Sequence, residues 1–447
     1  MGIINPSILP GFLELLPKDQ KVFDEMKYII EKNFIKYGFV NIDTPLIEKE
    51  DILLSKGGGE TSKQIYRIDK ESTKQALRFD LTVSLARYIS MYSHNLNFQF
   101  RRYQIGKVYR GERNQKGRYR EFYQCDIDIV GNEKLSIIND GEIPSIIYNI
   151  FKELGFKDIL FRINNRKLLQ GFLESIQIDK FEEVLRTIDK IEKIGKDKTI
   201  EELSKIGISN EDINKILEFI HSENTNEETI QKLNKIEIYN EIFIEGRDEL
   251  IKVYEYMQAF GIPKENIKLD LTITRGLDYY TGTVYETFLK GYESIGSVCS
   301  GGRYDDLANN FTKQKHPGVG LSIGLTRLYY QLNEANLLNL NEEKQESIIV
   351  IPMDEDVVDY SIDVVNDLRN NGIISQIYLE KGKVKKKFSY ADNIGTKIAV
   401  IIGENEKENQ EVSVKDFISG NQETVKRECL IEFLEERWKL HFQIIEK

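Results

Sequence analysis

A long β-hairpin is the feature of this sequence that most restricts the fold. Tyr103 to Arg110 predicts one arm, residues 111–117 a polar loop, and Arg118 to Val130 the second arm. Alternation along the second arm places four side chains on one face: Phe122, Gln124, Asp126 and Asp128. Buried, unpaired carboxylates are costly in an apolar core, so we expect this face to meet a polar ligand.

The base of the hairpin is strongly basic. Residues 101–120 hold eight Lys or Arg against the single acidic residue Glu112, although the whole chain carries a net charge of −11. Arginine forks suit phosphate oxygens. A second basic cluster comprises Lys381, Lys383 and Lys385 to Lys387. Taken alone, the hairpin equally fits a salt-bridged surface hairpin, and the lysine cluster fits a solvated face.

Length and composition set the broad class. A chain of 447 residues predicts two or three folding units. No run of about 18 uncharged apolar residues exists, so we expect no membrane span. Three scattered cysteines and four dispersed histidines predict neither a disulfide framework nor a zinc site. We expect a soluble, cytoplasmic protein, and the net negative charge argues against DNA as a partner.

The pattern along the chain changes three times. Apolar spacing near 3.6 predicts a helix over 17–37, and the run Gly57 to Gly59 predicts a mobile loop over 55–62. Helical spacing of Lys, Glu and Ile marks 165–258 as a helical insertion. After residue 341, strands alternate with helices, which predicts a small α/β domain with an open sheet. The predicted segments are 1–164, 165–258, 259–340 and 341–447.

Three further stretches combine glycine with charged or aromatic residues: Thr274 to Gly282, Cys299 to Asp305 and Gly318 to Leu328. Glycines let a ligand approach the backbone closely, and an arginine beside tyrosines offers a cation with hydrogen-bonding walls. Each stretch also has a plain structural reading. These are a tyrosine-rich turn, a hairpin turn and close packing of a strand on a helix.

Together these stretches resemble the class II aminoacyl-tRNA synthetases, and within them the histidyl-tRNA synthetase family. Tyr103 to Asp126 matches the second class II motif and Gly324 to Leu328 the third. The two histidine-specific stretches are matched by Arg275 to Tyr280 and Ser300 to Asp305. Lys386 to Asp392 and Val400 to Glu404 match the anticodon domain. One residue departs from the pattern: Thr326 stands where glutamate commonly precedes the motif-3 arginine.

The resemblance implies an α+β fold. An antiparallel sheet flanked by helices would form the catalytic domain from residues 1–164 and 259–340, interrupted by the helical insertion. Residues 341–447 would form an α/β anticodon-binding domain. The family dimerises, so the resemblance also implies a homodimer, formed through the first helix and the strand at 39–45.

The resemblance also implies a two-step reaction that joins L-histidine to tRNA-His at the expense of ATP. Arg110 and Arg275 would be catalytic. The implied histidine-binding residues are Asp80, Leu81, Thr82, Gln124, Asp128, Arg275, Tyr279 and Tyr280. The implied ATP-binding residues are Arg110, Glu112, Arg118, Phe122 and Arg327. Arg113, Gln115 and Lys116 would meet the tRNA, and Mg²⁺ would arrive with ATP, held mainly by its phosphates rather than by a protein metal site.

A catalytically silent paralogue is the main alternative, such as the regulatory subunit of ATP phosphoribosyltransferase. Such paralogues share the catalytic fold and act as binding modules. They typically lose the active-site arginines and the anticodon domain. This sequence retains Arg110, Arg275 and Arg327 together with a C-terminal α/β segment, which favours the enzyme.

Overall fold

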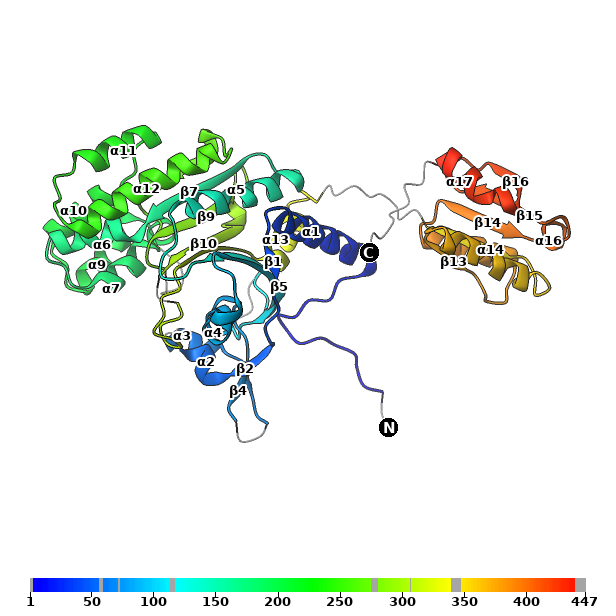
Figure 1. The fold of residues 1–447 in the computed structure, drawn as a ribbon, viewed down its shortest axis with the longest axis horizontal. Helices are drawn as coiled ribbons and strands as arrows, with labels where there is room; N and C mark the ends of the chain where they lie inside the picture. Colours follow the sequence, from blue (N-terminus) through cyan, green and yellow to red (C-terminus); the bar gives the residue numbers. More distant parts are fainter. Residues whose placement is uncertain are drawn as a thin grey trace. The chain divides into compact units, whose positions relative to one another are not determined.

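The computed structural model describes residues 3–55, 59–70, 73–112, 117–274, 280–305, 307–338 and 347–438. The chain divides into two compact units, Met1–Leu338 and Asn339–Lys447, each with its own sheet (Figure 1). Within the described ranges, no helix is both long enough and apolar enough to pass through a bilayer.

The larger unit is built on an eight-stranded sheet in the order β1-β5-β6-β11-β10-β9-β7-β8. Its strands are β1 (Val40–Asn41), β5 (Phe100–Tyr109), β6 (Glu121–Val130), β7 (Ile159–Asn165), β8 (Ile267–Leu269), β9 (Thr283–Leu289), β10 (Cys299–Tyr304) and β11 (Gly318–Ile323). The six inner strands pair antiparallel, which confirms the predicted sheet. The edge strands β1 and β8 pair parallel to their neighbours, a detail that the sequence did not indicate.

The predicted hairpin is the β5–β6 pair, in register from Phe100 opposite Val130 to Tyr109 opposite Glu121. Its two faces differ as the alternation predicted. On one face, Cys125 is fully buried, and the ring of Tyr123 packs against that of Phe23 with 5.6 Å between the ring centroids. The opposite face opens onto a cavity, described below.

Three helices cover the closed face of this sheet: α1 (Pro17–Lys36), α5 (Ile138–Glu153) and α13 (Leu325–Glu334) (Figure 1). α1 begins at a proline, whose missing N–H costs nothing in the first turn, and ends before Gly38, whose φ is +77°. Met26, Ile30 and Phe34 are fully buried on one side of it, at the spacing that predicted the helix.

A small three-stranded sheet and short helices lie before the hairpin in the chain. The sheet has the order β2-β4-β3, and the segment comprises β2 (Ile47–Lys49), α2 (Glu50–Leu54), α3 (Gly59–Gln64), β3 (Arg67–Ile68), β4 (Gln75–Leu77) and α4 (Thr82–Tyr92). The loop predicted over 55–62 is wrong from Gly59 onward, where α3 begins. Glycine is unfavourable inside a helix but is tolerated at its first position. The run of three glycines therefore suggested a loop, although its third residue begins α3.

The helical insertion stands between β7 and β8 in the chain. Its helices are α6 (Arg166–Ser175), α7 (Phe181–Ile188), α8 (Ile191–Ile194), α9 (Lys196–Lys205), α10 (Asn210–Ile220), α11 (Asn226–Lys235) and α12 (Glu241–Ala259). α6 and α12 approach closely because Gly171 and Gly246 face the partner helix. A Cβ at Gly171 would lie 2.4 Å from the backbone nitrogen of Phe243. α12 also packs on α5, which joins the insertion to the sheet.

The smaller unit is a five-stranded sheet in the order β13-β12-β14-β15-β16, with helices packed on it (Figure 1). Its elements are β12 (Ile348–Pro352), α14 (Val358–Asn370), β13 (Ser375–Ile377), α15 (Val384–Asn393), β14 (Ile398–Ile402), α16 (Glu404–Asn409), β15 (Glu411–Asp416), β16 (Gln422–Lys426) and α17 (Leu430–Trp438). The first three strands in chain order pair parallel, and the last two pair antiparallel. The predicted α/β domain with an open sheet is confirmed.

Candidate active site

A cavity of about 430 Å³ lies on the open face of the eight-stranded sheet. It brings together side chains from the hairpin, the segment before α4, β9, β10, β11 and α13. Four residues of the predicted histidine set line it: Asp80, Thr82, Gln124 and Tyr280. All five residues of the predicted ATP set line it as well: Arg110, Glu112, Arg118, Phe122 and Arg327.

Of the remaining predicted site residues, Asp128 lines an inner recess, described below. Leu81 is fully buried and lines neither this cavity nor its inner recess; its carbonyl accepts the N–H of Leu85 in the first turn of α4. Five others lie outside the described residues: Arg113, Gln115, Lys116, Arg275 and Tyr279.

Three arginines line the cavity. Arg110 follows β5, and its Nε donates to the carbonyl of Phe79 at 2.9 Å while its guanidinium stacks 5.2 Å from the ring centroid of Phe122. Arg118 pairs with Glu112 at 3.4 Å. Arg327 reaches the same cavity from the first turn of α13. Guanidinium groups from two distant stretches therefore meet at one cavity, as phosphate recognition requires.

Two buried carboxylates line the same cavity. The Oδ1 of Asp80 accepts the N–H of Val83 at 3.1 Å, and burial raises the pKa of Asp80 to about 6. Asp126 accepts a hydrogen bond from the hydroxyl of Ser322, which itself accepts from Nε2 of Gln124 at 2.9 Å. Burial also raises the pKa of Asp126. A cationic group entering here would neutralise charge that the protein alone compensates poorly.

Asp128 lies in a smaller recess of about 20 Å³, which shares Thr82, Asp126, Tyr280 and Ser322 with the main cavity. The recess exists because β11 carries Gly320 opposite Asp128. A Cβ at Gly320 would stand 2.1 Å from the Oδ1 of Asp128.

Two side chains that the sequence reasoning did not single out hold the Asp128 carboxylate. The hydroxyl of Tyr304 donates to Oδ1 at 2.8 Å, and Arg102 pairs with Oδ2 at 2.6 Å. Burial raises the pKa of Asp128 to about 7, against the opposing effect of Arg102. Arg102 faces the same side of the hairpin as Asp128 because the strand register sets the two residues opposite each other.

Two motif residues prove to be structural. Arg303 is buried away from the cavity, where its Nε donates to Asp140 at 3.0 Å and its Nη1 donates to the carbonyl of Leu135 at 3.2 Å. Thr326, the departure from the family pattern, is also buried, and its hydroxyl accepts the N–H of Tyr123 at 2.8 Å. The neighbouring Arg327 still reaches the cavity, so the departure does not displace the motif-3 arginine.

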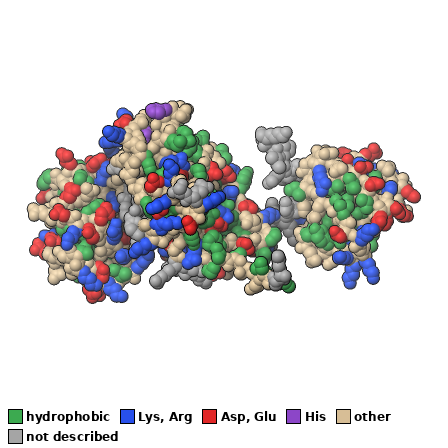
Figure 2. Space-filling view, turned by 90° about the horizontal axis from the view of Figure 1, so that it is seen from below, with side chains coloured by type: hydrophobic (Ala, Val, Ile, Leu, Met, Phe, Trp, Pro, Cys, Tyr) green, Lys and Arg blue, Asp and Glu red, His purple; other side chains and the backbone are tan. Residues whose placement is uncertain are grey.

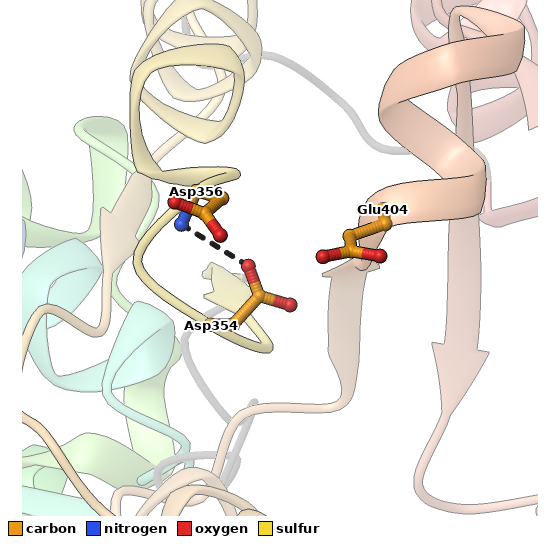
Figure 3. Close-up of side chains that lie close together, drawn as sticks. All are labelled: Asp354, Asp356 and Glu404. Carbon is orange, nitrogen blue, oxygen red and sulfur yellow. Dashed lines mark hydrogen bonds between the residues drawn. The ribbon is translucent and has the colours of Figure 1, made fainter.

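Among the described residues, one group of acidic side chains lies close enough together to hold a metal ion. In the smaller unit, Asp354, Asp356 and Glu404 bring carboxylate oxygens within 4.8 Å of one another (Figure 3). All three are exposed, and the Oδ1 of Asp354 accepts the N–H of Asp356 at 3.2 Å. Exposed acidic groups of this kind are common without an ion, so we assign no metal site to them.

Comparisons with known proteins agree with this geometry. A family model described as Histidyl-tRNA synthetase matches residues 11–328, and one described as Anticodon binding domain matches residues 347–437. The histidine–tRNA ligase of Clostridium tetani is 57% identical, covering 97% of this chain and 98% of that protein. That of Finegoldia magna is 54% identical, covering 97% and 100%.

A solved structure shows the same fold. The crystal structure of histidyl-tRNA synthetase from Nostoc sp. PCC 7120 superposes with a TM-score of 0.86 at 39% identity, over 97% of this chain and 100% of that one. Family models cover both units, and relatives above 50% identity span nearly the whole chain. The chain therefore belongs to the histidyl-tRNA synthetase family.

Proposed function

We propose that this chain is an active histidine–tRNA ligase. It activates L-histidine with ATP to give histidyl-adenylate and pyrophosphate, and it then transfers histidine to the 3′ end of tRNA-His. One observation carries the proposal: Arg110, Arg118 and Arg327 line the same cavity as the buried carboxylates of Asp80 and Asp126, and a recess that shares four of its lining residues holds Asp128. That combination suits an anionic nucleotide beside a cationic amino acid.

The first step brings an anionic carboxylate against an anionic phosphate. A carboxylate oxygen of histidine attacks the α-phosphorus, and the bond to the bridging oxygen breaks as pyrophosphate leaves. Preorganised positive charge lowers this barrier. Arg110 takes the α-phosphate and Arg327 the γ-phosphate, while Glu112, Arg118 and Phe122 hold the nucleotide. Arg275 supplies the remaining charge at the reacting phosphate, an assignment that rests on the sequence motif.

The buried carboxylates and their neighbours hold the amino acid. Asp80 and Gln124 receive the α-ammonium with Thr82 alongside, and Leu81 holds these two neighbours in place from the core. Asp128 and Tyr280 hydrogen-bond the two imidazole nitrogens, and Tyr279 completes the wall. A site whose buried polar groups need two ring nitrogens rejects amino acids that lack them by roughly 10⁴–10⁵-fold.

Mg²⁺ enters with ATP in this account. The cavity carries the carboxylates of Glu112 and Glu286, and carboxylate oxygens with waters are the ligands that Mg²⁺ takes when phosphates supply the rest. When bound, the ion would offset phosphate charge during the displacement.

The tRNA contacts both units in this proposal. Arg113, Gln115 and Lys116 meet the acceptor end, and the smaller unit reads the anticodon. Three exposed lysines around the start of α15 are available for phosphate contacts, Lys383, Lys385 and Lys386. The exposed Lys381 pairs with Glu355. Lys387 is a correction to this predicted cluster, because it is buried and donates to the carbonyls of Pro352 and Met353. Figure 2 shows charges of both signs intermixed on the visible face of each unit.

We further propose a homodimer in the cytoplasm. Tyr28, Ile35 and Val40 are each more than half exposed on α1 and β1, and β1 forms the edge of the large sheet, so a second copy would cover apolar surface there. Free cysteines at positions 125, 299 and 429 suit a reducing compartment. Residues 1–164 and 259–340 would form the catalytic domain, with 165–258 as its insertion and 341–447 as the anticodon domain.

Charging of tRNA-His tests the proposal against a silent paralogue. We expect the purified protein to esterify tRNA-His with radiolabelled histidine only when ATP and Mg²⁺ are present, and Arg327→Ala to raise the KM for ATP. A protein that binds histidine or ATP yet forms no histidyl-tRNA would support the regulatory alternative instead.

A further inference from the structure

Arg102 is a fully buried cation next to the proposed histidine pocket. It lies on β5 directly opposite Asp128 on β6, with 0% of its surface exposed. Its Nη2 stands 2.6 Å from the Oδ2 of Asp128. Arg102 does not line either cavity, so any effect on a ligand must pass through a neighbour.

The burial of this guanidinium needs an explanation. Among the described residues, none of its three guanidinium nitrogens donates a hydrogen bond, and Asp128 is its ion-pair partner. Removing a charge from water is expensive, and a buried pair of this kind often adds nothing to stability compared with apolar residues. A chain that keeps such a pair beside a ligand pocket therefore invites a functional explanation.

The surroundings of Asp128 favour the uncharged acid. Two further carboxylates face it, Asp126 on its own strand and Asp80 before α4, and both oppose its ionisation. Tyr304 on β10 donates to Oδ1 and remains a donor, since burial holds its pKa well above the usual value. Tyr280 lines the same recess, and β11 contributes only Gly320 there. Arg102 is the cation that opposes these carboxylates at Asp128, while Arg110 and Arg78 act on Asp126.

We propose that Arg102 is a positioning residue for histidine recognition, holding the Asp128 carboxylate ionised and oriented to accept an imidazole N–H. The inference rests on the proposed function of the cavity. Tyr304 occupies one lone pair of Oδ1, and Arg102 lies beside Oδ2 as an ion-pair partner, so each oxygen keeps an acceptor site. Without Arg102, Asp128 takes up a proton and presents a donor in place of an acceptor.

Histidine-dependent ATP–pyrophosphate exchange between pH 6 and pH 9 tests this role in the full-length protein. For Arg102→Met, an opposite charge is lost beside a buried acid, so the acid limb of kcat/KM for histidine moves up by about one to three pH units. At pH 7.5 the KM for histidine rises roughly 10- to 100-fold, the range seen when a residue that orients a binding group is removed. The KM for ATP stays within about twofold.

Two variants keep the test decisive. Arg101→Met is the matched control: Arg101 is the next residue on β5, pairs with Glu142 at 2.9 Å and lines neither cavity, so its pH profile matches wild type. Arg102→Lys retains the charge, so its acid limb stays within about 0.3 pH unit of wild type even if Arg102→Met proves unfolded.

The outcomes separate the inference from the proposed function. An unmoved acid limb in Arg102→Met, equal changes in both KM values, or an acid limb in Arg102→Lys that moves by a full unit would each overturn the positioning role. Absence of histidine-dependent exchange in the wild-type protein would instead overturn the function on which the inference depends.

Discussion

The hydroxyl of Thr326, in the first turn of α13, accepts the backbone N–H of Tyr123 on β6 at 2.8 Å. The last pair of the β6–β11 ladder is Cys125 opposite Ile323, and Tyr123 lies two residues N-terminal to Cys125 on β6. Thr326 thus satisfies a strand N–H beyond the end of the neighbouring strand. It joins the helix that carries Arg327 to the strand that carries Phe122 and Gln124.

Thr326→Val tests this link, because valine keeps the shape of threonine without the acceptor. Leaving the N–H of Tyr123 unpaired lowers the free energy of unfolding by about 1–3 kcal/mol. We also expect a higher KM for ATP, since Arg327 is the next residue. Urea unfolding followed by circular dichroism and steady-state exchange kinetics measure both effects. Thr326→Ser, which keeps the hydroxyl, should match wild type; equal losses in both variants would contradict the link.

Asp80→Asn should stabilise the protein while impairing histidine use. The pKa of Asp80 is about 6 in the folded protein, above its ordinary 3.8, so the folded state binds the proton more tightly. The ionised carboxylate therefore costs stability as pH rises from about 4 to about 6, and the full cost above pH 6 is about 3 kcal/mol.

The pH dependence provides the check on that prediction. At pH 8, Asp80→Asn should be more stable than wild type by up to about 3 kcal/mol, and this advantage should fall by about half at pH 5. The KM for histidine should rise, because the amide carries no charge for the α-ammonium. Asp69→Asn, at an exposed carboxylate, serves as the control. If Asp80→Asn is less stable than wild type at pH 8, the ionised Asp80 carboxylate does not lower the stability of the folded protein.

Gly320→Ala should selectively damage the imidazole recess. The added Cβ would stand 2.1 Å from the Oδ1 of Asp128, so the carboxylate must move. We expect the KM for histidine to rise at least about tenfold and the KM for ATP to change less than about twofold, since uniform binding of one substrate is lost. Steady-state exchange with each substrate varied in turn measures both. A larger effect on ATP than on histidine would place the imidazole elsewhere.

Salt should weaken tRNA binding through the lysines around α15. Phosphate contacts release counterions, so log KM for tRNA should rise linearly with log salt concentration. Lys385→Gln and Lys386→Gln should each reduce this slope by about 1. Lys426→Gln, whose lysine already pairs with Glu411 at 3.0 Å, should leave the slope unchanged. A slope that is identical in all three variants would exclude this cluster from the tRNA interface.

Much of the fold was readable because its signals are local. Alternation along Phe122 to Asp128 depends only on strand geometry, and it assigned the face that lines the cavity. The 3.6-residue spacing of Met26, Ile30 and Phe34 likewise defined α1. By contrast, α3 was hidden by the glycine run, where local preference suggested a loop.

The unpredicted parts of the site depend on contacts across strands or between distant segments. The pairing of Arg102 with Asp128 depends on the strand register that sets the two residues opposite each other. Arg303 lies in one of the two histidine-specific stretches, yet it pairs with Asp140, which is 163 residues away in the sequence. Gly106 gave no signal, although a Cβ there would stand 2.4 Å from the guanidinium of Arg78. Such relationships follow from tertiary packing and not from periodicity.

ATP–pyrophosphate exchange across the twenty amino acids measures the central claim most directly, with Asp128→Ala assayed beside the wild-type protein. Exchange should depend on histidine and remain negligible with the other nineteen, and Asp128→Ala should raise the KM for histidine strongly while the KM for ATP changes little. Comparable exchange with a different amino acid, or unaltered histidine kinetics in Asp128→Ala, would contradict the account.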